Sequence, residues 1–176
     1  MIRVWDPFVR VFHWALAASF AVAWISSENW EGVHDAAGYV AGGLVLLRVL
    51  WGFVGPRYAR FAKFVRPPGM VIDYLRAIGN GSERRYIGHN PAGGAMIVVL
   101  LAAMAATAVS GWLLTTDRFW GSTAMQHGHS LLAHGVLVLV ALHLGGVALA
   151  SLRHRENLVR AMIVGVKRPA EPGDVA

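Results

Sequence analysis

Four long apolar runs, separated by polar segments, dominate the hydrophobic pattern of this chain. Each is long enough, or nearly so, to cross a bilayer, and they cover residues 8–25, 34–54, 92–115 and 130–152. None shows the strict alternation of apolar and polar positions that barrel strands require, so each is predicted to be a helix. The pattern predicts an all-α integral membrane protein, with the four helices forming one bundle and residues 1–176 forming a single domain.

The connections between the runs indicate which helices are neighbours. The first two runs and the last two runs are joined by short segments, which favours antiparallel pairs. The central connection, residues 55–91, is longer, and residues 68–78 within it are predicted to form an amphipathic helix on the membrane surface. The side chains expected to face lipid are those of Met70, Val71, Tyr74 and Leu75.

The net charge of +6 is concentrated in two segments. Arginine and lysine are plentiful in the central connection, residues 55–91, and in the tail, residues 153–176, whereas the other two connections are nearly free of them. The positive-inside rule therefore places both segments and both termini in the cytoplasm. The charge is a topology signal, to which anionic lipid can contribute, and nucleic acid is not an expected partner.

The chain contains no cysteine. This excludes disulfides, cysteine-ligated iron–sulfur clusters and covalent attachment of a c-type haem, so any haem must be bound non-covalently. One alternative for the N-terminus is a secretory signal. Its features would be Arg3 and Arg10 at the start of the first apolar run and the small residues 21–23 near its end. Bulky tryptophans within the run argue against it, and cleavage would remove His13.

Histidines are the residues with metal-binding chemistry inside the apolar runs. His129 and His143 lie 14 residues apart, so one helix presents them within ~40° of the same face and roughly 21 Å apart along its axis. Polar groups inside a membrane are costly and usually functional, and two imidazoles at two depths predict two metal centres. Topology supplies a partner at each depth: His13 with His143 near the cytoplasm, and His34 with His129 near the outer side.

Paired histidines of this kind suit haem. Two imidazoles fill both axial positions of the iron, which favours electron transfer over oxygen binding. His134 is rotated by ~140° from the face of His129 and is expected to face another helix, a propionate or water.

Two further residues have more than one interpretation. Arg48 lies 14 residues after His34, and an intramembrane arginine needs an anion, which a haem propionate would supply; the alternative is snorkelling to the cytoplasmic surface. His89, in Gly-His-Asn-Pro, is either a helix-start residue beside a capping Asn90 or a group that helps to bind a quinone or a propionate.

Several short motifs follow one another in a specific order along the chain. They are Val4-Trp5-Asp6, Arg10-Val11-Phe12-His13-Trp14, His34 with Gly38, Leu47-Arg48-Val49-Leu50-Trp51-Gly52, Gly88-His89-Asn90-Pro91, Gly128-His129-Ser130, Leu142-His143 and Arg155-Glu156-Asn157-Leu158. This set resembles the bacterial cytochrome b561 family, which includes the cytochrome b subunits of membrane-bound nickel–iron hydrogenases. The resemblance covers nearly the whole chain.

The resemblance implies two non-covalent b-type haems, ligated by His13, His34, His129 and His143, in agreement with the pairing by depth. Family members exchange electrons with hydrogenase subunits or periplasmic c-type cytochromes, and some oxidise superoxide with a quinone as acceptor. It therefore implies a multi-pass protein of the bacterial inner membrane that moves electrons between the quinone pool and an outer-face partner. Ser130 stands where an acidic residue is commoner, which leaves the tuning of the outer haem open.

The resemblance does not choose a donor or an acceptor. If a quinone binds on the cytoplasmic side, Arg10, Arg48 and His89 are the candidate cofactor-binding residues. No dedicated catalytic constellation is visible, so transfer alone and a quinone-linked oxidoreductase both remain open.

Two other function classes stay open as well. One is a histidine-based transporter of metal ions or protons, although such a pathway typically has carboxylates and Asp35 is the lone candidate here. The other is a membrane anchor subunit of a larger redox complex.

Overall fold

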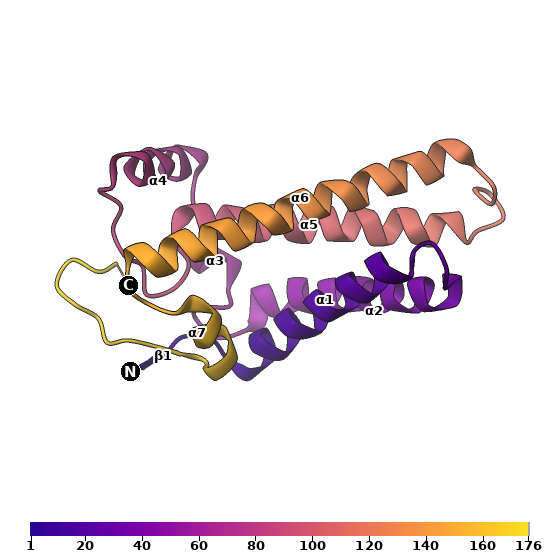
Figure 1. The fold of residues 1–176 in the computed structure, drawn as a ribbon. Helices are drawn as coiled ribbons and strands as arrows, with labels where there is room; N and C mark the ends of the chain where they lie inside the picture. The colour runs from indigo at the N-terminus through magenta and orange to yellow at the C-terminus, as the bar shows by residue number, and fades with distance from the viewer. Residues whose placement is uncertain (176) are drawn as a thin grey trace. The chain divides into compact units, whose positions relative to one another are not determined.

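The computed structural model describes residues 1–175, which are mainly helical. In chain order the elements are β1 (Ile2–Arg3), α1 (Pro7–Ser26), α2 (Glu31–Val54), α3 (Phe61–Phe64), α4 (Pro68–Asn80), α5 (Pro91–Leu114), α6 (Thr123–Arg153), α7 (Leu158–Val164) and β2 (Val166–Lys167) (Figure 1). The all-α class is confirmed, and the two strands are only a short clasp between the ends of the chain.

Four of these helices, α1, α2, α5 and α6, are long and apolar enough to cross a membrane. They confirm the four predicted spans, and three of them begin and end within a few residues of the predicted bounds. Helix α6 begins at Thr123 rather than near residue 130, because the Ser122 hydroxyl accepts a hydrogen bond from Met125 N at 3.4 Å and the polar first turns remain helical. The bundle arrangement, the single domain and the cytoplasmic termini stay predictions.

The described residues fall into two compact units, and each long helix contributes to both. Unit 1 contains Met1–Arg10, Trp51–Val99 and the described residues from Ala141 onward, whereas unit 2 contains Val11–Leu50 and Leu100–Val140. Unit 1 therefore holds the chain ends and the central connection. Unit 2 holds most of α1 and α2, the part of α5 that precedes the α5–α6 loop and the part of α6 that follows this loop.

In unit 1 the two chain ends pair with each other. Strands β1 and β2 are antiparallel, with Ile2 opposite Lys167 and Arg3 opposite Val166. A small apolar core lies beneath them and consists of Val4, Trp5, Ile87 and Ala161. Because Ile87 comes from the central connection, this core ties that connection to both ends of the chain.

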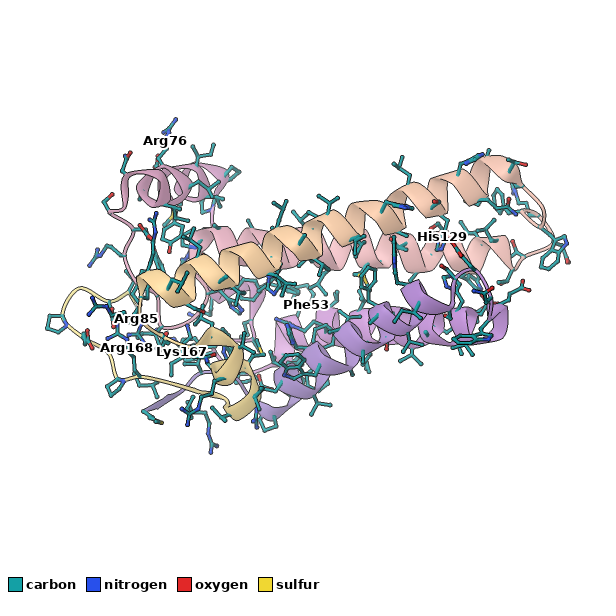
Figure 2. The ribbon with its side chains drawn as sticks, viewed as in Figure 1. Phe53, Arg76, Arg85, His129, Lys167 and Arg168 are labelled. Carbon is teal, nitrogen blue, oxygen red and sulfur yellow. The ribbon has the colours of Figure 1, made fainter. Side chains whose placement is uncertain are left out.

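A buried charged cluster reinforces the same junction (Figure 2). Arg85 donates to Glu156 at 2.7 Å and is also paired with Asp174, and all three side chains are buried. Lys167 Nζ lies 3.8 Å from Glu156 and 5.6 Å from the centre of the Trp5 ring. Burial alone would raise the pKa of Glu156, but the hydrogen bond and positive charge of Arg85 outweigh burial and hold this pKa below its ordinary value.

Helix α4 confirms the predicted amphipathic helix but corrects one of its faces. Met70 and Leu75 are exposed, as expected of lipid-facing side chains, but Tyr74 is only 7% exposed, so the prediction that it faces lipid is wrong. The residues after α4 fold back over it: Tyr74 Oη donates to the carbonyl of Arg84 at 3.4 Å, and the ring lies 5.6 Å from that of Tyr86. Burial, with a smaller contribution from the charge of Glu83, raises the pKa of Tyr74 to about 12.

In unit 2 helices α2 and α5 approach closely. A Cβ placed on Gly42 would lie 3.3 Å from the Cβ of Ala108, so glycine is needed for ordinary contact between these helices. Nearer the N-terminal end of α2, Tyr39 Oη lies 3.2 Å from Oγ1 of Thr115, the residue after α5. These contacts fix α2 against α5 in the region where the candidate site lies.

Candidate functional site

Unit 2 brings together the predicted outer pair of histidines. His34 is in the first turns of α2 and His129 is in the second turn of α6, yet their ring centroids lie 6.0 Å apart with the ring planes at 86° (Figure 2 labels His129). The two residues are 95 positions apart in the sequence. Depth in the predicted membrane was the argument for pairing them, and their proximity agrees with it.

The Nδ1 atoms of both rings are already engaged. His34 Nδ1 lies 2.8 Å from the carbonyl oxygen of Ala23, which can only accept, so this nitrogen carries the proton. His129 Nδ1 lies 2.9 Å from Ser110 Oγ, and that hydroxyl donates its own proton to the carbonyl of Thr107 at 2.9 Å. With its proton on that carbonyl, Ser110 Oγ accepts from His129 Nδ1–H, and the Thr107 carbonyl is a second hydrogen-bond partner of this histidine. In both rings Nε2 is left unprotonated, which is the state of a metal-ligating imidazole.

The spacing of the rings fits one metal between them. A metal–imidazole bond is about 2 Å long, and the ring centre lies about 1 Å behind the nitrogen, so two imidazoles on opposite sides of one metal have centroids about 6 Å apart. The observed 6.0 Å matches this value. Within residues 1–175 no group of three or more histidine, cysteine, aspartate or glutamate side chains could hold a metal ion. The pair supplies two ligands, so a metal held here would take its other ligands from elsewhere, as iron does from the macrocycle in haem.

Two residues of this site, Ser110 and Gly111, escaped the sequence analysis. Ser110 is only 7% exposed and orients His129, as described above. A Cβ on Gly111 would lie 3.1 Å from His129 Cε1, so glycine gives the ring its room. The one available signal was a Ser-Gly pair inside an otherwise apolar run.

Three other predicted residues lie in unit 2. Arg48 is only 3% exposed, which speaks against the interpretation that it snorkels to a surface. The ring of His13 lies edge-on to Trp14, at a centroid distance of 5.1 Å. His134 Nδ1 lies 2.8 Å from the carbonyl of Ser130, and its ring meets Trp24 of α1 at 5.1 Å. His134 thus faces another helix, as expected.

His143 belongs to unit 1, whereas His13 belongs to unit 2. The pairing of these two histidines therefore stays a prediction. Helix α6 is uninterrupted between His129 and His143, so the predicted separation of roughly 21 Å along one helix stands.

Arg10 and His89, the remaining candidates, are both in unit 1. Arg10 Nη1 donates to the carbonyl of Ile163 at 2.7 Å, which gives this side chain a structural contact with α7. The His89 ring lies between Trp5 and Phe64, with centroid distances of 4.5 and 4.7 Å. Their roles toward a cofactor stay predictions.

Asn90 caps helix α5, as expected if His89 is a helix-start residue. Its Oδ1 accepts from Gly93 N at 2.7 Å, and its carbonyl accepts from Gly94 N at 2.8 Å. His89 is therefore at a helix start, and this position leaves its ring in contact with aromatic neighbours.

Comparison with known proteins gives a distant relative and a family. A curated relative, described as a probable Ni/Fe-hydrogenase B-type cytochrome subunit of Bradyrhizobium diazoefficiens, is 23% identical over an alignment that covers 95% of this chain and 86% of the relative. No solved structure gives a significant match. The family model described as prokaryotic cytochrome b561 matches residues 4–165. Since this match spans nearly the whole chain, the protein belongs to the prokaryotic cytochrome b561 family, a family of membrane b-type cytochromes that transfer electrons.

Proposed function

We propose that this protein is a di-haem b cytochrome that carries electrons between the quinone pool and a redox partner at the outer face of the bacterial inner membrane. The observation that carries the proposal is the pair His34 and His129, with ring centroids 6.0 Å apart and both Nδ1 atoms engaged. This geometry leaves two Nε2 atoms to ligate one iron.

The outer haem is assigned to His34 and His129. The Ala23 carbonyl and the Ser110 hydroxyl hold the two rings in one tautomer and orientation, and accepting the Nδ1 protons makes Nε2 a stronger donor to iron. When bound, a haem with two imidazole ligands supplies a one-electron couple and leaves no iron position open to oxygen. A site with these two ligands is therefore suited to electron transfer and not to oxygen chemistry.

The inner haem is assigned to His13 and His143. Support comes from α6, which carries His143 on the same face as His129 and roughly 21 Å further along the axis. Arg48 is buried and lies on α2, 14 residues after His34. A buried guanidinium is suited to a charge-assisted hydrogen bond with a haem propionate, and we assign Arg48 this role.

A hydrogenase subunit is the outer-face partner that we favour, since the curated relative is described as a hydrogenase B-type cytochrome subunit. A periplasmic c-type cytochrome, or superoxide as a small reductant, would meet the same haem edge. We place the basic central connection and the tail in the cytoplasm by the positive-inside rule. Arg10 and His89 are the residues that we propose for the quinone.

Haem stoichiometry tests the two-haem assignment. Pyridine haemochrome quantitation of the purified full chain is expected to give two haems b, and His143→Ala is expected to give one. His127→Ala is the matched control, because His127 is an exposed histidine of the same helix, and it should keep both haems. A value of one haem in the wild type would contradict the di-haem proposal, and the complete lack of haem would favour the transporter or anchor classes.

Reduction by a quinol tests the electron path. We expect a short-chain quinol to reduce the cytochrome, and His89→Ala to slow this reduction while dithionite still reduces the variant fully. If no quinol reduces the protein and no quinone reoxidises it, the quinone part of the proposal is wrong, whereas the haem assignment stands or falls by its own measurement.

A further inference from the structure

A small cavity of about 240 Å³ lies in unit 1 and is lined mainly by the two ends of the central connection. Three of its lining residues are cations, namely Arg57, Lys63 and Arg66, and His89 lines it as well, so a ligand here would lie beside the residue proposed for the quinone. The volume is below the ~300–1,000 Å³ of pockets for drug-sized ligands. A compact charged group is therefore a better occupant than an extended ring system.

The charge of this cavity is uncompensated among the described residues. No carboxylate lines it, and none of its three cations has an ion pair within residues 1–175. The neighbouring Arg85 shows the contrast, because Glu156 and Asp174 neutralise it. Arg57 and Lys63 are exposed and Arg66 is half-buried, so solvent screens part of their mutual repulsion, and an anion in the cavity would neutralise the rest.

The walls of the cavity are fixed by aromatic contacts. The Tyr58 ring packs directly on Gly88, where an added Cβ would lie 2.9 Å from Tyr58 Cδ1. The guanidinium carbon of Arg57 lies 5.7 Å from the Tyr58 ring centre, which orients this cation beside the wall. Phe64 is only 3% exposed and follows Lys63 in α3, so a buried side chain anchors the backbone beside this exposed lysine.

We propose that this cavity binds a phosphate group. Arginine and lysine together are the side chains that bind phosphate oxygens best, arginine by paired hydrogen bonds and lysine as a point charge. The phosphate can come from the headgroup of an anionic phospholipid or from free phosphate. Val65 is 44% exposed and lies between two lining residues, and the nearby Met70 of α4 is 46% exposed. This apolar border suits acyl chains and favours the lipid source.

Binding is measured on the full-length haem-loaded protein in detergent. Native mass spectrometry gives the retained adducts of phosphatidylglycerol and of phosphatidylcholine, and ³¹P line broadening reports on inorganic phosphate. The test variants are the double substitution Lys63→Gln with Arg66→Gln, and Ala62→Trp, which adds bulk at a lining position without changing the charge. Arg160→Gln is the matched control, because Arg160 is an exposed cation of unit 1 that does not line the cavity.

The double variant is expected to bind its phosphate ligand about tenfold more weakly or worse, since two charge-assisted contacts are lost. Ala62→Trp should weaken binding to a similar extent, and Arg160→Gln should stay within about twofold of the wild type. Loss of phosphatidylglycerol adducts alone identifies the lipid as the source, whereas loss of phosphate line broadening identifies the free ion. Equal weakening in Arg160→Gln, or unchanged binding of both ligands in the two test variants, overturns the proposal. The haem content plays no part in this outcome, so it is distinguishable from a failure of the proposed function.

Discussion

The hydroxyl of Ser110 offers the sharpest test of the outer haem site. Ser110→Ala removes the acceptor that lies 2.9 Å from His129 Nδ1 and leaves the rest of α5 in place. Because Ser110 is only 7% exposed, water is poorly placed to replace the hydroxyl. The variant therefore removes the side-chain acceptor of His129 Nδ1–H and leaves the Thr107 carbonyl as its remaining partner.

The size of the effect follows from that loss. Loss of one hydrogen bond costs about 0.5–1.5 kcal/mol, which corresponds to roughly 2–13-fold in an equilibrium constant. Loss of such a partner of a metal-ligating histidine typically weakens metal binding by about 10–100-fold. A less basic imidazole also stabilises ferric iron less, so the reduction potential of the outer haem should rise.

The assay is haem transfer from the purified cytochrome to an excess of a haem-scavenging apoprotein, together with a redox titration. Thr107→Ala is the matched control, because the Thr107 hydroxyl donates only to the carbonyl of Ala103 in its own helix, at 2.9 Å. Ser110→Thr keeps a hydroxyl and should recover most of the affinity. The reasoning is refuted if Ser110→Ala loses haem no faster than Thr107→Ala and keeps the wild-type potential.

Three further variants give four predictions, one at the outer histidine site and three in unit 1. Gly111→Ala places a Cβ 3.1 Å from His129 Cε1, so it should reduce the haem content to about one per chain, and a wild-type content would contradict the close approach. Glu156→Gln weakens the buried pair with Arg85, and the loss of such a pair costs up to about 3–5 kcal/mol. Amide hydrogen exchange of residues 166–175 should therefore accelerate, and an unchanged exchange rate would contradict this role of the pair. The same pair stabilises the wild type fully above the ordinary glutamate pKa of 4.5, and its contribution is lost as the pH falls through the lowered pKa of Glu156. In Glu156→Gln the free energy of unfolding should therefore depend less on pH in acid. Because the pKa of Tyr74 is about 12, Tyr74→Phe should leave the phenolate absorbance unchanged up to about pH 11, whereas a decrease below pH 10 would show that Tyr74 is solvated.

Much of this architecture could be predicted from the sequence because membrane burial imposes a strong composition on spanning helices. The apolar runs locate α1, α2 and α5 closely, and depth alone pairs His34 with His129. The start of α6 was missed because a polar helical turn that extends beyond an apolar run has the same composition as a loop. Only the cap at Ser122 distinguishes them.

Two kinds of contact were beyond the sequence argument. A hydroxyl in an apolar helix usually donates to its own backbone, as Ser110 does, and nothing in the sequence shows that its oxygen also accepts from His129. The burial of Tyr74 depends on how the residues after α4 fold back over that helix, and helical periodicity does not contain this information. The sequence identified the metal-binding side chains, whereas the groups that orient them required the fold.

The central claim is that His34 and His129 hold the same iron, and haem counting in His34→Ala, His129→Ala and the double variant tests it most directly. If the two rings share one haem, each single substitution removes one of two haems b per chain, and the double variant loses no more than either single variant. Loss of both haems in the double variant, with one lost in each single variant, would place the two histidines on different irons and contradict the account.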